Sequence, residues 1–233
     1  MPYQTFLKLP RKERERKQHR LEVLETAEKL FVSKGFHGTS IQEIAGAAEF
    51  SVGKIYTLFE SKEDIYATLT DMRAEEVYQL TKAAHSREGT AWEKIRRNLT
   101  GLLEFLDSHK EILHIFIYQT AGFPLKISAG VSGGVYEYYI KTLECIQQTF
   151  REGVISGEFI NSDAEDLVLA WAGIVQMFCM YETFARPEAS LQPLVERIMK
   201  VFANQLVRDI DYRHGNELLN RAERVEFMET DRE

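Results

Sequence analysis

The chain of 233 residues is long enough for one or two domains with a substantial core, and its hydrophobic content of 44% is ordinary for a soluble protein. No run of eighteen apolar residues occurs, and the start lacks the apolar segment of a secretory signal, so we expect neither a membrane span nor export. The two cysteines, Cys145 and Cys179, lie in apolar helical stretches, which favours reduced thiols in a cytoplasmic protein over a disulfide.

The first twenty residues carry the opposite charge to the rest of the chain. The net charge is −7, yet residues 1–20 hold seven lysines and arginines against two glutamates. We interpret residues 1–17 as a basic arm that contacts nucleic-acid phosphates, an interaction whose affinity falls with salt. The alternative is a solvated tail without a partner.

A first helix is predicted upstream of Gly35, which is a typical residue for a helix C-terminus. Apolar residues recur at helical spacing ahead of this glycine and form one stripe. The stripe consists of Leu21, Leu24, Ala27, Leu30 and Phe31.

Three further helix starts follow within thirty residues. Ser40 and Glu43 form the S-x-x-E pattern of a capping box. Ser51 is a plausible N-cap for the segment "VGKIYTLF", and Ser61 begins a third helix with acidic residues in its first turn. The sequence therefore predicts a helix, a tight turn and a second helix over residues 40–59.

The second of these short helices has an outward face suited to DNA. Ile55 and Phe59 point inward, and a glycine in so short a helix costs about 1 kcal/mol relative to alanine, which makes sense where another molecule approaches the backbone. Lysine, tyrosine and threonine side chains suit phosphates and base edges in the major groove. The predicted DNA-binding residues are Val52, Gly53, Lys54 and Thr57 in the groove, Gln42 at a base, Ser40, Tyr56 and Lys62 at phosphates, and Ser51 at the helix start.

The segment from about Arg20 to about Leu69 resembles the DNA-binding domain of the TetR family of transcriptional regulators. It contains, in order and at matching spacing, the segments "A..LF...G", "TS...IA..A" and "S.G.IY..F.SKE". The resemblance implies an all-α fold in which a three-helix helix-turn-helix domain precedes a larger helical bundle that binds a ligand and dimerises. We accordingly expect a DNA-binding domain at 18–77, an effector-binding and dimerisation domain at 78–211, and a charged tail at 212–233.

Two residues depart from the family pattern in the turn of the motif. Many relatives have glycine where Glu49 stands, so we expect Glu49 to adopt a positive φ at a cost of about 1 kcal/mol. Phe50 replaces a smaller valine and is expected to hold the turn against the core.

Beyond Leu69 the pattern is helical throughout, with no strand alternation. The resemblance implies that the last two helices pair with their copies in a homodimer, which would match a palindromic DNA site. The alternative is that both helices merely close the core of a monomer. The predicted helices span about 62–84, 90–107, 110–120, 132–156, 163–185 and 190–209, the last with an apolar stripe of Leu194, Ile198, Val201, Phe202 and Leu206.

Aromatic and polar residues in the middle helices suit a cavity for a small hydrophobic or aromatic effector, because tyrosine combines an apolar body with a polar tip. Each of them alone is also compatible with an ordinary core position. The predicted effector-pocket residues are His114, Phe116, Tyr118, Phe123, Tyr136, Tyr139, Trp171, Met177 and Tyr181.

The sequence has no recognisable catalytic, phosphate-binding or paired-cysteine motif, so we expect no enzyme, no cofactor and no metal. His109 and His114 lack an obvious third ligand. The favoured function is a homodimeric regulator that a small effector releases from double-stranded DNA, most often a repressor in this family. The alternatives are an activator or architectural DNA binder without effector, and a small-molecule carrier with a vestigial DNA-binding domain.

Overall fold

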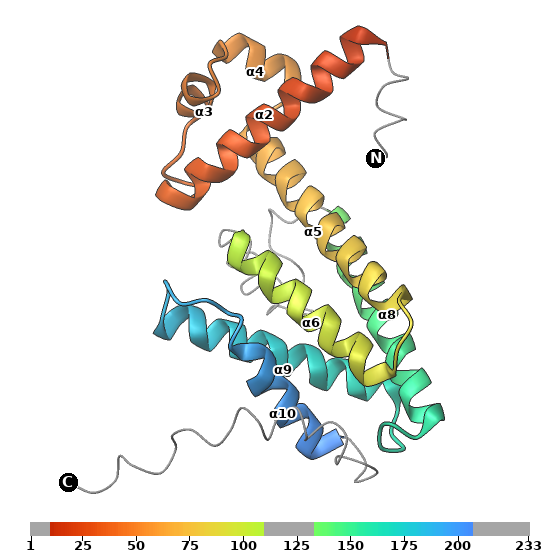
Figure 1. Ribbon diagram of the computed structural model, residues 1–233. Helices are drawn as coiled ribbons and strands as arrows, with labels where there is room; N and C mark the ends of the chain where they lie inside the picture. Colours follow the sequence, from red (N-terminus) through yellow and green to blue (C-terminus); the bar gives the residue numbers. More distant parts are fainter. Residues whose placement is uncertain (1–9, 110–132, 207–233) are drawn as a thin grey trace, which may run out of the picture.

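The computed structural model describes residues 10–109 and 133–206, and within these residues it contains helices and no β-strand. The predicted all-α fold is therefore confirmed (Figure 1), whereas the helix predicted at 110–120 lies outside the described residues. The helices are α2 (Arg11–Lys34), α3 (Ile41–Ala47), α4 (Val52–Leu58), α5 (Lys62–Ser86), α6 (Ala91–Ser108), α8 (Gly133–Ser156), α9 (Ala164–Ala185) and α10 (Leu194–Leu206).

The first helix starts earlier than its apolar stripe suggests. Pro10 occupies the N-cap of α2, so residues 11–17 of the predicted arm are helical, and an exposed pair of Arg11 with Glu15 at 2.7 Å spans one turn. The predicted apolar stripe is partly wrong, because Leu21 is 42% exposed and Val23 is buried instead. The charges of this segment keep the helix extended beyond the point where packing begins.

The predicted helix ends are confirmed by hydrogen bonds. The Ser40 hydroxyl accepts from the Glu43 main-chain N–H at 3.2 Å, and the Glu43 carboxylate accepts from the Ser40 N–H at 2.9 Å. The hydroxyls of Ser51 and Ser61 likewise accept from a main-chain N–H in the first turn of α4 and of α5, at 3.1 Å each. Such caps satisfy main-chain donors that short helices cannot pair internally.

The turn between α3 and α4 has the predicted strained residue. Glu49 adopts a φ of 58°, the left-handed region that glycine occupies without cost. Phe50 packs against the N-terminal core and meets the His19 ring edge-on, with 5.1 Å between the ring centroids. The aromatic side chain thus holds the turn against α2.

Two separate apolar cores form; α5 contributes to the N-terminal core and also packs against α6 and α8, which form part of the second. Buried residues of α2, α3 and α4 pack against Ile65 and Leu69 near the start of α5. The second core joins α6, α8, α9 and α10, with Phe150, Trp171 and Phe202 near its centre. Figure 1 shows α5 running from the small N-terminal helices to α6 and α8. A rigid helix of 25 residues therefore links the two parts.

The apolar stripe of α10 faces the chain's own core. Leu194, Ile198 and Phe202 are at most 1% exposed, so this stripe packs inside the chain, and the pairing of α10 with a second copy stays a prediction. The helix also begins four residues later than predicted, since Pro193 precedes it and the Asp107 carboxylate accepts from the Leu191 N–H at 2.9 Å.

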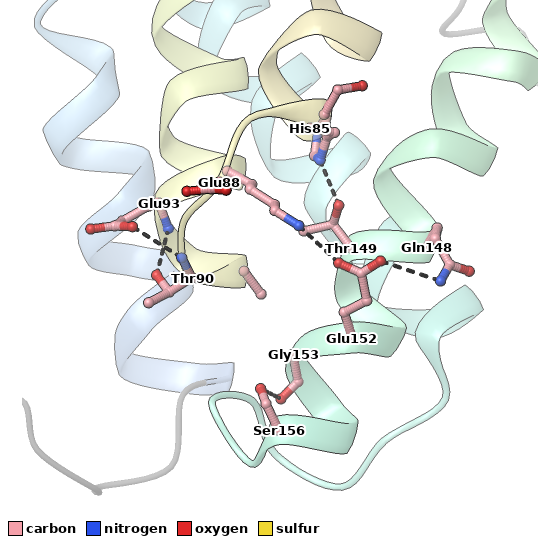
Figure 2. Close-up of polar contacts among 12 residues, drawn as sticks. His85, Glu88, Thr90, Glu93, Gln148, Thr149, Glu152, Gly153 and Ser156 are labelled. Atoms are coloured by element: carbon pink, nitrogen blue, oxygen red, sulfur yellow. Dashed lines mark hydrogen bonds and ion pairs between the residues drawn. The ribbon is translucent and has the colours of Figure 1, made fainter.

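Gly153 in α8 lies where no side chain fits. A Cβ there would stand 2.2 Å from the ring of Phe159, which is 2% exposed, and Figure 2 shows Gly153 on the same helix as Thr149 and Ser156. We expect Gly153→Ala to lower the free energy of unfolding by about 1–3 kcal/mol, as overpacking does, measured by urea denaturation. Adding Phe159→Leu should recover part of the loss. Full wild-type stability of the single variant would contradict this packing.

Candidate nucleic-acid interface and internal cavity

One face of α4 is open to solvent. Ile55 and Leu58 are buried beneath the helix, while Gly53, Tyr56 and Thr57 are exposed, Tyr56 by 55%. Val52 and Lys54 are half-buried at the edge of the same face, and Gln42 on α3 is exposed. The structure thus places Val52, Gly53, Lys54 and Thr57 on one short helix, although Val52 also packs against the N-terminal core.

Several predicted contacts have a second task within the chain. The hydroxyls of Ser40 and Ser51 are the caps described above, and the Thr57 hydroxyl donates to the Lys54 carbonyl at 2.7 Å. Cap serines leave other main-chain N–H groups at the helix start facing outward, a position that suits phosphate. Their DNA contacts stay predictions.

Lys62 is placed differently from the prediction. Its ammonium donates to the carbonyls of Phe36 and Thr39 at 2.8 Å each and lies 4.3 Å from the centroid of the Phe36 ring. The side chain therefore fixes the loop between α2 and α3. These two bonds leave one N–H of the ammonium for another acceptor, and the contact of Lys62 with a DNA phosphate stays a prediction.

Gly53 has no packing role inside the chain, because a Cβ there would meet no atom within 4 Å. We expect Gly53→Ala to raise the free energy of unfolding by about 1 kcal/mol through helix propensity. If DNA approaches the helix closely here, the same change should weaken specific DNA binding. Gly46→Ala, at an exposed helical glycine that is equally unobstructed, is the control for stability alone. Chemical denaturation measures the change in stability, and fluorescence anisotropy measures the change in DNA affinity. Unaltered DNA affinity in Gly53→Ala would show that Gly53 does not lie in the interface.

A cavity of about 110 Å³ lies between α5, α6, α8 and α9. Its wall is almost wholly apolar, and the few polar groups include Asn98, whose amide donates to the Thr81 hydroxyl at 2.9 Å. The lining residues are Thr70, Arg73, Ala74, Val77, Thr81, Asn98, Leu99, Leu102, Val135, Tyr139, Thr142, Leu143, Ile146, Trp171, Ala172, Val175 and Gln176.

The predicted pocket residues divide into three groups. Tyr139 and Trp171 line the cavity. Tyr136, Met177 and Tyr181 lie outside it and are 49%, 57% and 63% exposed. The third group, His114, Phe116, Tyr118 and Phe123, falls outside the described residues.

The sequence reasoning missed the α5 wall of the cavity. Thr70, Ala74, Val77 and Thr81 recur every three or four residues along one face, a spacing that was visible but lacked the aromatic residues on which the prediction relied. Small and hydroxyl side chains on a core-facing stripe leave room, which large ones would fill.

Arg73 is the charged residue among those that line the cavity, and it also reaches the N-terminal domain. Its Nε donates to Glu28 of α2 at 2.9 Å, a second guanidinium nitrogen contacts the other Glu28 oxygen, and a third donates to Glu76 at 2.7 Å. Burial opposes the charge, but the hydrogen bonds that the guanidinium donates to both carboxylates outweigh it and raise the pKa of Arg73. This bidentate pair ties α2 to α5.

The outer face of α9 is apolar and exposed. Leu169, Met177, Tyr181 and Phe184 are 48–63% exposed along one side of the helix. We call these four residues the α9 stripe. By length and composition α9 would also suffice to cross a membrane, a weak indication that core helices share. Within the described residues, no group of three or more His, Cys, Asp or Glu side chains is placed to hold a metal ion.

Comparison with known proteins shows which family the N-terminal helices match. The family model of bacterial regulatory proteins, tetR family, matches residues 23–69, which span the interior of α2 through the start of α5. The N-terminal domain is therefore of the TetR type. It is 31% identical over 91 residues to the uncharacterized HTH-type regulator YuxN of Bacillus subtilis; the alignment covers 39% of this chain and 31% of that relative. The chain thus matches about a third of the length of this relative.

Solved TetR-like structures share the whole fold. The fatty acid degradation regulator FadR of Bacillus halodurans superposes with a TM-score of 0.69 at 15% identity, over 80% of this chain and 95% of that one. FadR of Bacillus subtilis, in complex with stearoyl-CoA, gives a TM-score of 0.67 at 17% identity, over 78% and 96%. At these identities the likeness establishes the fold of this chain and not its ligand.

Proposed function

We propose that this protein is a homodimeric transcriptional repressor that a small apolar effector releases from a palindromic operator. The observation that carries the proposal is the outer face of α4, where Gly53, Tyr56 and Thr57 are exposed and Lys54 is half-buried, within the segment that matches the family model. The helix has the size that the major groove admits.

The α9 stripe supports the dimer. Four large apolar side chains on one helix face are costly to leave in water and are typical of an interface. An isologous dimer through this stripe would present two copies of α4, as a palindromic site requires. The charged outer side of α10, with Glu196 and Lys200, would then flank the interface.

The cavity supports control by an effector. It is apolar and lined by four helices, among them α5, whose first turns also belong to the N-terminal core. Binding there would shift α5 and alter the separation of the two α4 helices. FadR of Bacillus subtilis, which has a similar fold, binds stearoyl-CoA, a ligand with a long apolar chain.

The test is selection of bound sequences from a random duplex pool by the purified protein at two salt concentrations. A recovered palindrome is expected, with affinity falling on the order of a thousandfold between about 50 and 200 mM salt. Recovery of no motif would contradict the proposal and favour a carrier with a vestigial DNA-binding domain.

A further inference from the structure

Arg73 stands between the cavity and the DNA-binding domain. Its side chain is 12% exposed and lines the cavity, together with Thr70 and Ala74 on neighbouring turns of α5. Its guanidinium grips Glu28, whose side chain is 10% exposed on α2. Since α2 packs against α3 and α4, a change at Glu28 reaches the helices of the motif.

The charges around Arg73 are already matched. Glu28 and Glu76 supply two carboxylates to one guanidinium, so a further anion would face an excess of negative charge. A cationic ligand would have to leave water for a wall that is almost wholly apolar, at a large desolvation cost. An uncharged ligand avoids both penalties, and the Asn98–Thr81 pair offers it polar groups.

The size of the cavity narrows the ligand further. Its 110 Å³ falls below the roughly 150 Å³ of a protein cavity that holds one benzene molecule. A six-membered ring with one small substituent therefore already exceeds this volume and would displace the surrounding side chains. Occupation therefore presses on the wall, and the Arg73 stem is part of that wall.

We propose that the cavity takes a compact uncharged apolar ligand, and that Arg73 couples its occupation to α2 by loosening the grip on Glu28. This inference rests on the proposed effector role of the cavity. Arg73 acts here as a positioning residue. The coupling is reciprocal, so whatever holds α2 in place also disfavours the ligand.

The experiment uses three ring compounds of similar size: benzyl alcohol, benzoate and benzylammonium. Binding to the full-length protein is measured by calorimetry, and amide hydrogen exchange is followed in residues 23–31 of α2. Benzyl alcohol should bind at least about tenfold tighter than either ion and should speed exchange in α2. In Glu28→Gln the exchange should be fast without ligand and unchanged by it, while benzyl alcohol still binds.

The matched control is Glu196→Gln, which breaks the pair between Arg96 and Glu196 on α6 and α10, away from the cavity. It should keep the wild-type response. Preferred binding of benzoate, or no binding of benzyl alcohol, would overturn the proposed ligand class. A change of amide exchange in α2 on binding that persists in Glu28→Gln would overturn the coupling through Arg73. Because this readout needs no DNA, it stays decisive even if the selection recovers no operator.

Discussion

Placing aspartates at Met177 and Tyr181 together should convert the protein from dimer to monomer. Both side chains are more than half exposed on the α9 stripe, and two charges per copy facing two others across a two-fold axis would be desolvated and repelled. Sedimentation equilibrium measures the change in mass. Operator affinity should fall on the order of a hundredfold or more, because each monomer would bind one half-site without its neighbour.

The control for this variant is Ile155→Asp. Ile155 is 80% exposed near the end of α8 and lies outside the α9 stripe, so its replacement should leave the dimer intact. A double variant that sediments as a dimer would contradict the assignment of the interface to α9.

Replacing His85 by asparagine should make the free energy of unfolding depend less on pH in mild acid. His85 is 8% exposed, and its Nδ1 lies 2.6 Å from the Thr149 hydroxyl (Figure 2). Burial, helped by the nearby Lys94, lowers the pKa of His85 from 6.5 to about 4. The folded protein therefore binds fewer protons than the unfolded chain between these values, and stability rises with pH across that window.

The contribution of His85 is fully present above about pH 6.5 and is lost as the pH falls toward about 4. A pKa displacement of this size corresponds to about 3 kcal/mol. Urea denaturation between pH 4 and 7 should show a shallower loss for His85→Asn than for wild type. The exposed His37, replaced in the same way, should retain the wild-type profile; identical slopes for all three would show that His85 does not titrate as described.

Local signals predicted the N-terminal half well because they act over a few residues. Capping by Ser40, Ser51 and Ser61 depends on hydrogen bonds three residues away, and the positive φ of Glu49 was expected because many relatives have glycine at this position. These features need no tertiary information. The start of α2 was missed because charged residues without an apolar face can still extend a helix that is anchored further along.

Contacts between residues far apart in the sequence determine the features that local patterns could not predict. An amphipathic stripe on α10 is compatible with a dimer or with the chain's own core, and the position of Asp107 and of the bundle resolves this in favour of the core. Likewise, the sequence indicates Lys62 as a phosphate ligand, but only the structure shows that its ammonium also donates to two carbonyls. The pair of Arg73 with Glu28 joins residues 45 positions apart and left no local pattern.

The central claim is that two α4 helices, held by one dimer, read a single DNA site. The most direct test takes the selected operator and inserts about five or about ten base pairs between its half-sites, which is half a helical turn or a full turn. We expect the half-turn insertion to abolish tight binding because it rotates one half-site to the opposite face of the duplex. Equal affinity for the original and the half-turn operator would show that the two heads bind independently, and would contradict the claim.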